Sequence, residues 1–477
     1  MSKLHVVSNR APIEVTHDEG GARRIRPTVG GLASALDDAI RRRSGSWIAW
    51  TGSPDVLRPE ETGLDYPITS VHLSESEIDD YYAGFSNQVL WPLCHMFLDR
   101  CRFQPQFWAA YESANGRFAE AVQAVAEPGD LVWINDFHLC LVPSLLRRRT
   151  RDLRLGVFWH TPFPPPPIFG VLRWRERVLE GLLGADVIGL QTTDDVRNFL
   201  DCCNQFLGYY VDENPARVVV GDREVRVVAL PVGIDAAAFE RRASSDAILL
   251  QRDRLRATLG AEVVLMGVDR LDYTKGIPER LRGYERFLER HPRWRRRCTF
   301  VQVVVPSRDR VADYRAMKRR IDEIVGRIMG KYTVDGRSPI VYLYTALDQD
   351  RLTAYYSAAD AALVTPLRDG MNLVAKEYVA CHAAHGDGVL ILSEFAGAAR
   401  GMGEAVLVNP YDPEAIGGAI EIALDMPHDE RARRMHSLSV RVRTHDLGWW
   451  TDAFLTLLAE PMSAVPGPTV EAALAAL

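Results

Sequence analysis

VVLMGVDRLDYTKGIPERLRGYERFLER, residues 263–290, contains one complete unit of alternating α/β structure. It begins with the apolar run Val263–Val268, which has the length and composition of a strand buried on both faces. A charged loop follows, and Glu279–Glu289 then has the apolar spacing of an amphipathic helix. A buried strand, a polar loop and a covering helix are the repeating parts of a parallel sheet.

The same unit recurs in both halves of the chain. Short apolar runs alternate with helix-length segments such as Leu352–Ala358. The further runs are Leu4–Ser8, Leu131–Ile134, Leu155–Trp159, Val187–Leu190, Phe300–Val305, Ile340–Leu343, Ala361–Val364 and Val389–Leu392. We therefore predict an α/β protein with two doubly wound, Rossmann-like domains.

The join between the two domains is also predicted from the sequence. Residues 217–230 alternate around Gly221 and Asp222, which indicates a hairpin, and the turn-rich segment 230–235 suits a hinge. We predict an N-terminal domain over residues 1–231 and a C-terminal domain over residues 235–448. A final helix at about 449–464 is expected to pack back onto the first domain, and residues 465–477 are expected to form a tail without chemistry.

Length, charge and cysteine usage narrow the class of protein. The chain has 477 residues, enough for two large domains, and its net charge of −6 does not favour nucleic acid as a partner. The seven cysteines form no C-x-x-C pair, which is typical of a reducing compartment. Neither a signal-peptide core nor an apolar run of about 18 residues occurs, so we expect a cytoplasmic protein without a membrane partner.

Polar residues follow six of the predicted strands, where open parallel sheets bind ligands. If two such domains face each other, these residues surround one cleft. They are Asn9 and Arg10, Asn135 and Asp136, His160, Arg270 to Lys275, Arg308, and Asp369 to Asn372.

The chemistry of these residues favours anion binding. Arg270 and Lys275 could hold a diphosphate through one guanidinium fork and one point charge, although a surface salt-bridge loop is the alternative. Residues 369–372 precede a helical pattern, so their amides could bind an anion, or Asp369 or Asn372 could simply cap the helix.

Several common sites are missing from the sequence. There is no G-x-x-x-x-G-K-[ST] phosphate loop, no G-x-G-x-x-G fingerprint and no His/Cys cluster with zinc spacing. The Asp348-Gln349-Asp350 motif directly precedes a predicted helix, and we interpret it as a cap. No metal and no cofactor are therefore expected.

Seven motifs, in this order and spacing, resemble the trehalose-6-phosphate synthases of glycosyltransferase family 20. They run from Val6 to about Trp450 and are VVSNR (6–10), GGL (30–32), YYAGFSNQVLWP (81–92), HTPFP (160–164), GVDRLDYTKGIPERL (267–281), TPLRDGMNLVAKEY (365–378) and SEFAGAA (393–399). The resemblance implies the GT-B fold, two facing Rossmann-like domains with a catalytic cleft between them.

The resemblance also implies roles for individual residues. Arg270 and Lys275 would hold the donor diphosphate, Gly30 would close over it, and Glu377 would bind the ribose hydroxyls. The rest of the implied donor site is Gly31, Asp369, Gly370, Met371, Asn372, Leu373 and Val374.

For the acceptor, the resemblance implies a phosphate site and a sugar site. Arg10, Tyr82 and Arg308 would hold the phosphate, Trp91 and Asp136 would contact the sugar, and His160 would lie at the reacting glucosyl group. The implied catalytic set is His160, Asp136, Arg270, Lys275 and Asp369.

The implied reaction moves glucose from a nucleotide-glucose, with UDP-glucose favoured, to glucose 6-phosphate and yields α,α-trehalose 6-phosphate. It retains configuration without a protein nucleophile, which agrees with the lack of an obvious carboxylate pair at the strand ends. The alternatives are a glucosylglycerol-phosphate synthase that uses glycerol 3-phosphate and, more remotely, a non-catalytic sensor of sugar phosphates. The sequence leaves open which base the donor carries (uridine, guanosine or adenosine). It also leaves open whether the chain forms a homo-oligomer, either a dimer or a tetramer.

The sequence departs from the family pattern at two neighbouring positions. The family usually has W-x-H-D-Y-H, but here Asn135 replaces the first His and Phe137 replaces the Tyr. Because Asp136 is intact, we expect altered hydrogen bonding around it rather than lost activity.

Overall fold

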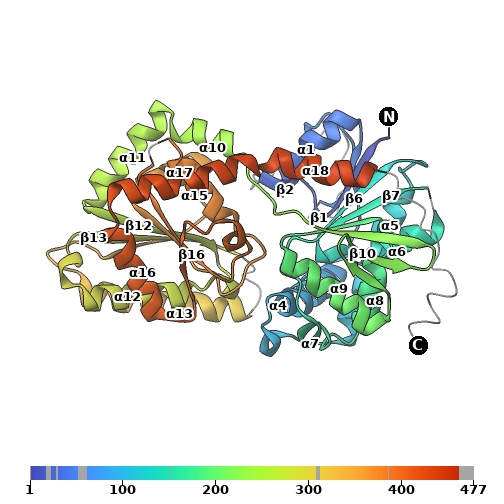
Figure 1. Cartoon of the computed structure of the whole chain (residues 1–477), viewed down its shortest axis with the longest axis horizontal. Coiled ribbons are helices and arrows are strands. Elements are labelled where there is room, and N and C mark those ends of the chain that lie inside the picture. Colours follow the sequence, from blue (N-terminus) through green and yellow to red (C-terminus); the bar gives the residue numbers. More distant parts are fainter. Residues whose placement is uncertain are drawn as a thin grey trace. The chain divides into compact units, whose positions relative to one another are not determined.

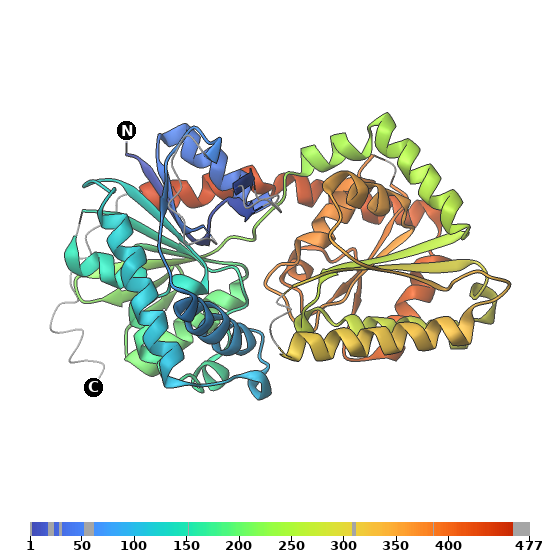
Figure 2. The same ribbon diagram turned by 180° about the vertical axis from the view of Figure 1, so that it is seen from behind.

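The computed structural model describes residues 2–17, 23–27, 31–51, 62–150, 152–307, 312–384 and 386–460 (Figures 1 and 2). This part of the chain divides into two compact units. Unit 1 contains the described residues up to Leu230 and from Trp450 onward, and unit 2 contains Pro231–Trp449. The predicted tail, residues 465–477, lies outside the described residues.

Unit 1 is built on a mainly parallel sheet. Its strand order, within the described ranges, is β5-β4-β1-β6-β7-β8-β11-β10-β9, and only β10 and β9 run antiparallel to their neighbours. The strands are β1 (Leu4–Arg10), β4 (Ser46–Trp50), β5 (Ile68–Ser70), β6 (Leu131–Asn135), β7 (Arg154–Phe158), β8 (Val187–Leu190), β9 (Val211–Glu213), β10 (Ala216–Val220) and β11 (Arg223–Ala229). A separate antiparallel pair consists of β2 (Ile13–His17) and β3 (Arg23–Pro27).

Helices cover both faces of this sheet (Figures 1 and 2). The longer ones are α1 (Gly31–Arg43), α5 (Pro105–Gln123), α6 (Val142–Arg149), α8 (Arg175–Leu182), α9 (Thr193–Leu207) and α18 (Leu447–Ala459). The shorter ones are α3 (Glu75–Glu77), α4 (Trp91–Cys94), α7 (Pro166–Phe169) and two 3₁₀ turns, η2 (Leu98–Arg100) and η3 (Phe137–Leu139). The segment η1 (Ile78–Leu90) is π-helical, a form that is rare and often occurs at functional sites.

The last helix, α18, completes the core of unit 1. The ring of Trp450 lies 5.1 Å from that of Trp133 on β6, and the ring of Phe454 lies 4.5 Å from it. A Cβ atom at Gly156 or Gly189 would come within 3.0 Å of the Phe454 ring. Glycine on β7 and β8 therefore makes room for α18.

Unit 2 contains a parallel sheet with the strand order β14-β13-β12-β15-β16-β17 in its described part. The strands are β12 (Val263–Arg270), β13 (Cys298–Val305), β14 (Ile340–Tyr344), β15 (Ala361–Val364), β16 (Val389–Ser393) and β17 (Val406–Val408). The helices are α10 (Ala236–Ala243), α11 (Asp246–Leu259), α12 (Ile277–Arg290), α13 (Ala312–Tyr332), α14 (Gln349–Ala358), α15 (Leu373–His382), α16 (Pro413–Asp425) and α17 (His428–Thr444), with 3₁₀ turns η4 (Tyr273–Lys275), η5 (Pro292–Trp294) and η6 (Gly397–Gly401).

The predicted α/β class with two doubly wound sheets is confirmed. Each apolar run named above lies in a strand, although β7 ends at Phe158, one residue before the predicted end. The hairpin around Gly221 and Asp222 is formed by β10 and β11. The interpretation of Asp348 as a cap is confirmed, because its carboxylate accepts a hydrogen bond from Arg351 N at 2.8 Å.

Two further findings concern the whole described chain. All seven cysteines are buried and free. No helix in the described ranges combines the length and the apolar composition that crossing a bilayer requires.

Candidate functional site

Both sheets contain a topological switch point, where the strand order reverses. Counted in chain order within its own sheet, unit 2 has the order 3-2-1-4-5-6, and the first six parallel strands of unit 1 have the same order. Ligands of such sheets bind beyond the carboxyl ends of the strands at this point. The switch point lies between β12 and β15 in unit 2 and between β1 and β6 in unit 1.

At the unit 2 switch point, Lys275 follows β12 and Asp369 follows β15. The ammonium of Lys275 forms an ion pair with Asp369 Oδ2, and that oxygen also accepts a hydrogen bond from Asn372 Nδ2 at 3.0 Å. Lys275 is only 9% exposed. Arg270, the last residue of β12, is exposed. Two cations and one carboxylate thus lie at the edge where a ligand is expected.

The loop that presents Lys275 is fixed by tight backbone contacts. Asp272 accepts a hydrogen bond from Thr274 N, and Leu367 N donates to Thr274 O at 2.7 Å. Gly276 has a φ of +63°, and a Cβ atom there would lie 2.4 Å from Thr365 O. Only glycine allows the loop after β12 to approach the loop after β15 this closely.

Arg280, which was not predicted from the sequence as a site residue, stabilises the loop that presents Lys275. Its side chain is 0% exposed and pairs with Asp269 at 2.7 Å. It also donates hydrogen bonds to Thr365 Oγ1 at 2.9 Å, Gln302 Oε1 at 3.3 Å and Lys275 O at 3.2 Å. A signal was present, because Arg280 falls on the apolar face of α12.

The loop before α15 places main-chain amides at the same edge. Asn372 has a φ of +68° and its side chain bonds to Asp369 instead of capping the helix. Gly397 N donates to Asp369 O at 3.1 Å, and a Cβ atom at Gly397 would lie 1.8 Å from Gly370 O. The amides at the start of α15 are thus a candidate anion site.

The other residues expected at the donor site lie in or beside α15. Met371 is buried, and Leu373 and Val374 form the first turn of the helix. Glu377 Oε2 accepts a hydrogen bond from Tyr356 Oη at 2.8 Å. Burial raises the pKa of Glu377, and this hydrogen bond opposes the rise.

At the unit 1 switch point, Arg10 lies against two aromatic rings. Its guanidinium carbon is 5.3 Å from the centre of the Trp50 ring and 5.4 Å from that of Tyr82. Tyr82 belongs to η1 and stacks on His138 with a centroid distance of 5.9 Å. Because the Arg10 side chain is exposed yet held by cation–π contacts, its guanidinium can face an anionic ligand.

Trp91, which the resemblance implies at the acceptor sugar, is mostly buried and does not present an open ring face. It is 7% exposed, and its ring contacts His95 at 4.2 Å and Phe137 at 6.0 Å between centroids. Most of its surface is therefore used by the core of unit 1.

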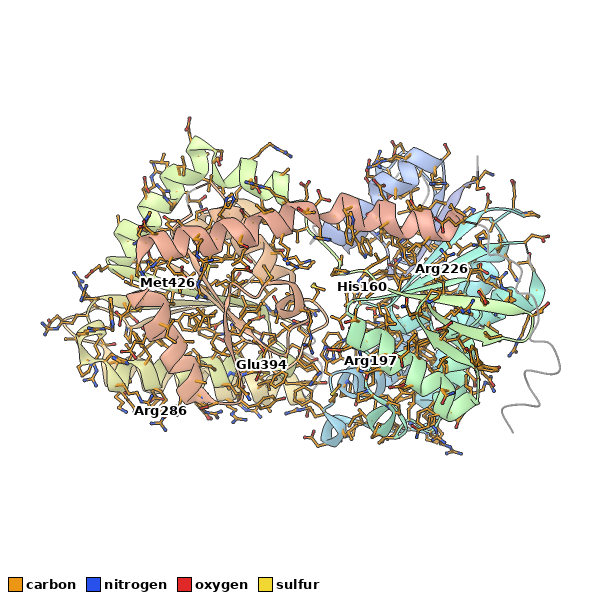
Figure 3. The ribbon with its side chains drawn as sticks, in the orientation of Figure 1. His160, Arg197, Arg226, Arg286, Glu394 and Met426 are labelled. Carbon is orange, nitrogen blue, oxygen red and sulfur yellow. The ribbon has the colours of Figure 1, made fainter. Side chains whose placement is uncertain are left out.

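Asp136 and His160 follow β6 and β7 and contact each other. Asp136 has a φ of +69°, uncommon for a residue other than glycine, and its Oδ1 accepts a hydrogen bond from His160 N at 3.1 Å. Burial raises the pKa of Asp136 to about 6 and lowers the pKa of His160 to about 4. His160, labelled in Figure 3, is therefore a neutral imidazole at pH 7.

The structure places the expected site residues in separate groups. Unit 2 joins Lys275, Asp369 and Asn372, and unit 1 joins Arg10 with Tyr82. Gly31 begins α1. Gly30 and Arg308 lie outside the described residues. Within the described ranges, no group of three or more His, Cys, Asp or Glu residues has an arrangement suited to a metal ion.

Comparisons of the sequence with a family model and with known proteins indicate the same family. The model of glycosyltransferase family 20 matches residues 2–460. A trehalose-6-phosphate synthase of Mycobacterium sp. (strain JLS) is 42% identical, with 97% of each chain covered. A bifunctional trehalose-6-phosphate synthase/phosphatase of Thermoproteus tenax is also 42% identical over 97% of this chain, but the chain spans only 64% of that protein.

Solved structures agree with these relatives. A structure described as trehalose-6-phosphate from E. coli bound with UDP-2-fluoro glucose has a TM-score of 0.88 at 34% identity, covering 97% of this chain and 100% of that one. An α,α-trehalose-phosphate synthase (UDP-forming) from Burkholderia xenovorans in complex with glucose-6-phosphate has a TM-score of 0.87 at 32% identity, covering 96% of this chain and 100% of that one.

Proposed function

Because the chain belongs to glycosyltransferase family 20, we propose that it transfers glucose from UDP-glucose to glucose 6-phosphate and releases α,α-trehalose 6-phosphate. The chain is a glycosyltransferase, and its curated relatives are named trehalose-6-phosphate synthases. The choice of donor and acceptor draws support from the two solved relatives, one with UDP-2-fluoro glucose and one with glucose-6-phosphate.

The donor is assigned to unit 2. The observation that carries this assignment is the pair of Lys275 and Asp369 at the switch point between β12 and β15. An ammonium group has three hydrogens, so Lys275 can contact a phosphate oxygen while it stays paired with Asp369. Arg270 supplies a second cation, and Asp369 accepts hydrogen bonds from sugar hydroxyls. Both cations stabilise the diphosphate as it leaves, which lowers the barrier to transfer.

The acceptor is assigned to unit 1. Arg10, held against the rings of Trp50 and Tyr82, binds the phosphate of glucose 6-phosphate, and the Tyr82 hydroxyl adds a donor. Asp136 is mostly ionised at pH 7 and accepts a hydrogen bond from a sugar hydroxyl. Glycerol 3-phosphate has no ring hydroxyls for such a contact.

We infer transfer with retention. In this mechanism the oxygen of the departing diphosphate accepts the proton of the attacking hydroxyl on the same face of the sugar. The protein contributes position and electrostatic stabilisation instead of a nucleophile.

A product assay tests the function. The purified chain is incubated with UDP-, GDP- or ADP-glucose and with glucose 6-phosphate, glucose or glycerol 3-phosphate. NMR of the product is expected to show an α,α-1,1-linked phosphorylated disaccharide from UDP-glucose and glucose 6-phosphate. Faster turnover of glycerol 3-phosphate would overturn the acceptor assignment, and equal use of unphosphorylated glucose would refute the phosphate site.

A further inference from the structure

Asn135, the last residue of β6, has a side chain whose orientation is fixed by two carbonyl groups. It is 4% exposed, and its Nδ2 lies 3.4 Å from Val7 O on β1 and 3.5 Å from Trp133 O on β6. A carboxamide nitrogen can only donate hydrogen bonds, so these carbonyls determine which end of the amide is nitrogen. The other end, Oδ1, can only accept.

That acceptor faces the imidazole of His160. The distance from Asn135 Oδ1 to His160 Nε2 is 3.3 Å. An oxygen acceptor at this position requires a hydrogen on Nε2. A neutral imidazole has one N–H only, so the second nitrogen, Nδ1, is left as an acceptor.

The remaining described neighbours of the ring keep it neutral and in place. The Phe158 and Trp450 rings lie 4.8 Å and 6.0 Å from it. The one ionisable side chain among its described contacts is Asp136, which bonds to the main-chain N of His160 and not to the ring. Burial lowers the pKa of His160 to about 4, in agreement with a neutral ring.

We propose that Asn135 is a positioning residue that holds His160 as the Nε2–H tautomer, so that Nδ1 is left to accept a hydrogen bond from a hydroxyl of a bound sugar. The identity of the sugar rests on the proposed function. The tautomer has a chemical consequence, because glycosyl transfer develops positive charge on the sugar ring. A neutral imidazole can hold the sugar without placing a second positive charge beside the ring. An imidazolium would add such a charge.

The tautomer can be measured directly by ¹⁵N NMR of the full chain labelled at histidine, with His160 assigned from the His160→Gln spectrum. Between pH 6 and 8, Nε2 is expected to carry the proton and Nδ1 to show the shift of an unprotonated nitrogen. In Asn135→Leu the two tautomers are expected to mix. A proton on Nδ1, or an imidazolium at pH 7, would overturn the proposal.

A matched control separates this role from loss of a buried amide. Asn115 is also buried, and its Nδ2 donates to Tyr111 O at 2.9 Å and His138 O at 3.1 Å. Asn115→Leu is expected to lower stability but to leave the His160 resonances unchanged. If both leucine variants change the His160 resonances alike, the effect is structural and the proposal fails.

Two further measurements test the sugar contact. UDP-glucose is expected to shift the Nδ1 resonance, whereas UDP alone is not; equal spectra with both would refute the contact. In Asn135→Asp, a carboxylate beside the ring would favour the imidazolium at low pH, and an imidazolium cannot accept a hydrogen bond at Nδ1. The kcat of this variant is therefore expected to be about five- to tenfold lower at pH 6 than at pH 9, which corresponds to the loss of one hydrogen bond. An equal loss at every pH would contradict the tautomer role.

The outcomes distinguish this proposal from the proposed function. An Nε2–H tautomer in a chain that makes no trehalose 6-phosphate would refute the function and leave the tautomer assignment standing. An Nδ1–H tautomer in a chain that makes trehalose 6-phosphate would refute the tautomer assignment and leave the proposed function standing.

Discussion

Replacing Arg280 by methionine is expected to destabilise unit 2 by about 3–5 kcal/mol. The guanidinium is fully buried, and its removal would leave the buried carboxylate of Asp269 without its partner. Breaking a buried pair in this way typically costs about 3–5 kcal/mol, and Thr365 and Gln302 would each lose a hydrogen bond as well. For a unit of this size, the loss corresponds to a decrease of roughly 6–20 °C in the melting temperature.

The assay is thermal and urea unfolding of the full chain, with Arg282→Met as the control. Arg282 lies on the same helix and pairs with Glu279 at 3.2 Å, but it is partly exposed, so its loss is expected to cost less than about 1 kcal/mol. The double variant Arg280→Met with Asp269→Asn is expected to recover part of the stability, because no buried charge is left unpaired. A single Arg280 variant as stable as the control, or a double variant no better than the single one, would refute this explanation.

The remaining predictions concern catalysis. Arg270→Ala and Lys275→Ala are each expected to lower kcat/KM by about 100-fold, because each removes a cation from the leaving diphosphate; near-normal kinetics in both would contradict the donor assignment. Activity is expected to survive EDTA, since residues 348–350 begin a helix; complete loss restored by Mg²⁺ or Mn²⁺ would show that this motif was misinterpreted. Because the pKa of Asp136 is raised to about 6, its carboxylate becomes protonated as the pH falls, and kcat/KM should decrease below about pH 6. Asp136→Asn should abolish this decrease in the pH profile, and a decrease that is unchanged in the variant would exclude Asp136 as its source. Arg10→Gln is expected to raise the KM for glucose 6-phosphate at least tenfold in initial-rate assays, and an unchanged KM would remove Arg10 from the phosphate site.

The strands and the residues at their ends could be predicted because the signals are local. A run such as Val263–Val268 identifies its own strand, and the residues that follow it must lie at the carboxyl edge of the sheet. This reasoning located Lys275 and Asp369 on the loops after β12 and β15. Their ion pair also depends on the strand order, which places β12 beside β15.

The features that could not be predicted depend on tertiary contacts. The position of Arg280 on the apolar face of α12 indicates its burial, but the partners that satisfy its charge follow only from the groups that surround it in the fold. The contact between Asn135 and His160 joins the ends of two neighbouring strands, and its direction depends on two main-chain carbonyls. The π-helical segment η1 differs from an α-helix in hydrogen-bond register, which residue spacing alone does not reveal.

The packing of Trp450 and Phe454 against Trp133 has a consequence for biosynthesis. Most of unit 1 precedes unit 2 in the chain, yet these two rings in its core belong to a helix that is synthesised after unit 2. At about 5–20 residues per second, the ribosome needs roughly 10–50 s to pass from Leu230 to the end of α18. During that interval the apolar surface around β6 stays uncovered on the nascent chain, while unit 2 can already fold. Chaperones that bind exposed hydrophobic segments therefore have more time to bind unit 1 than unit 2.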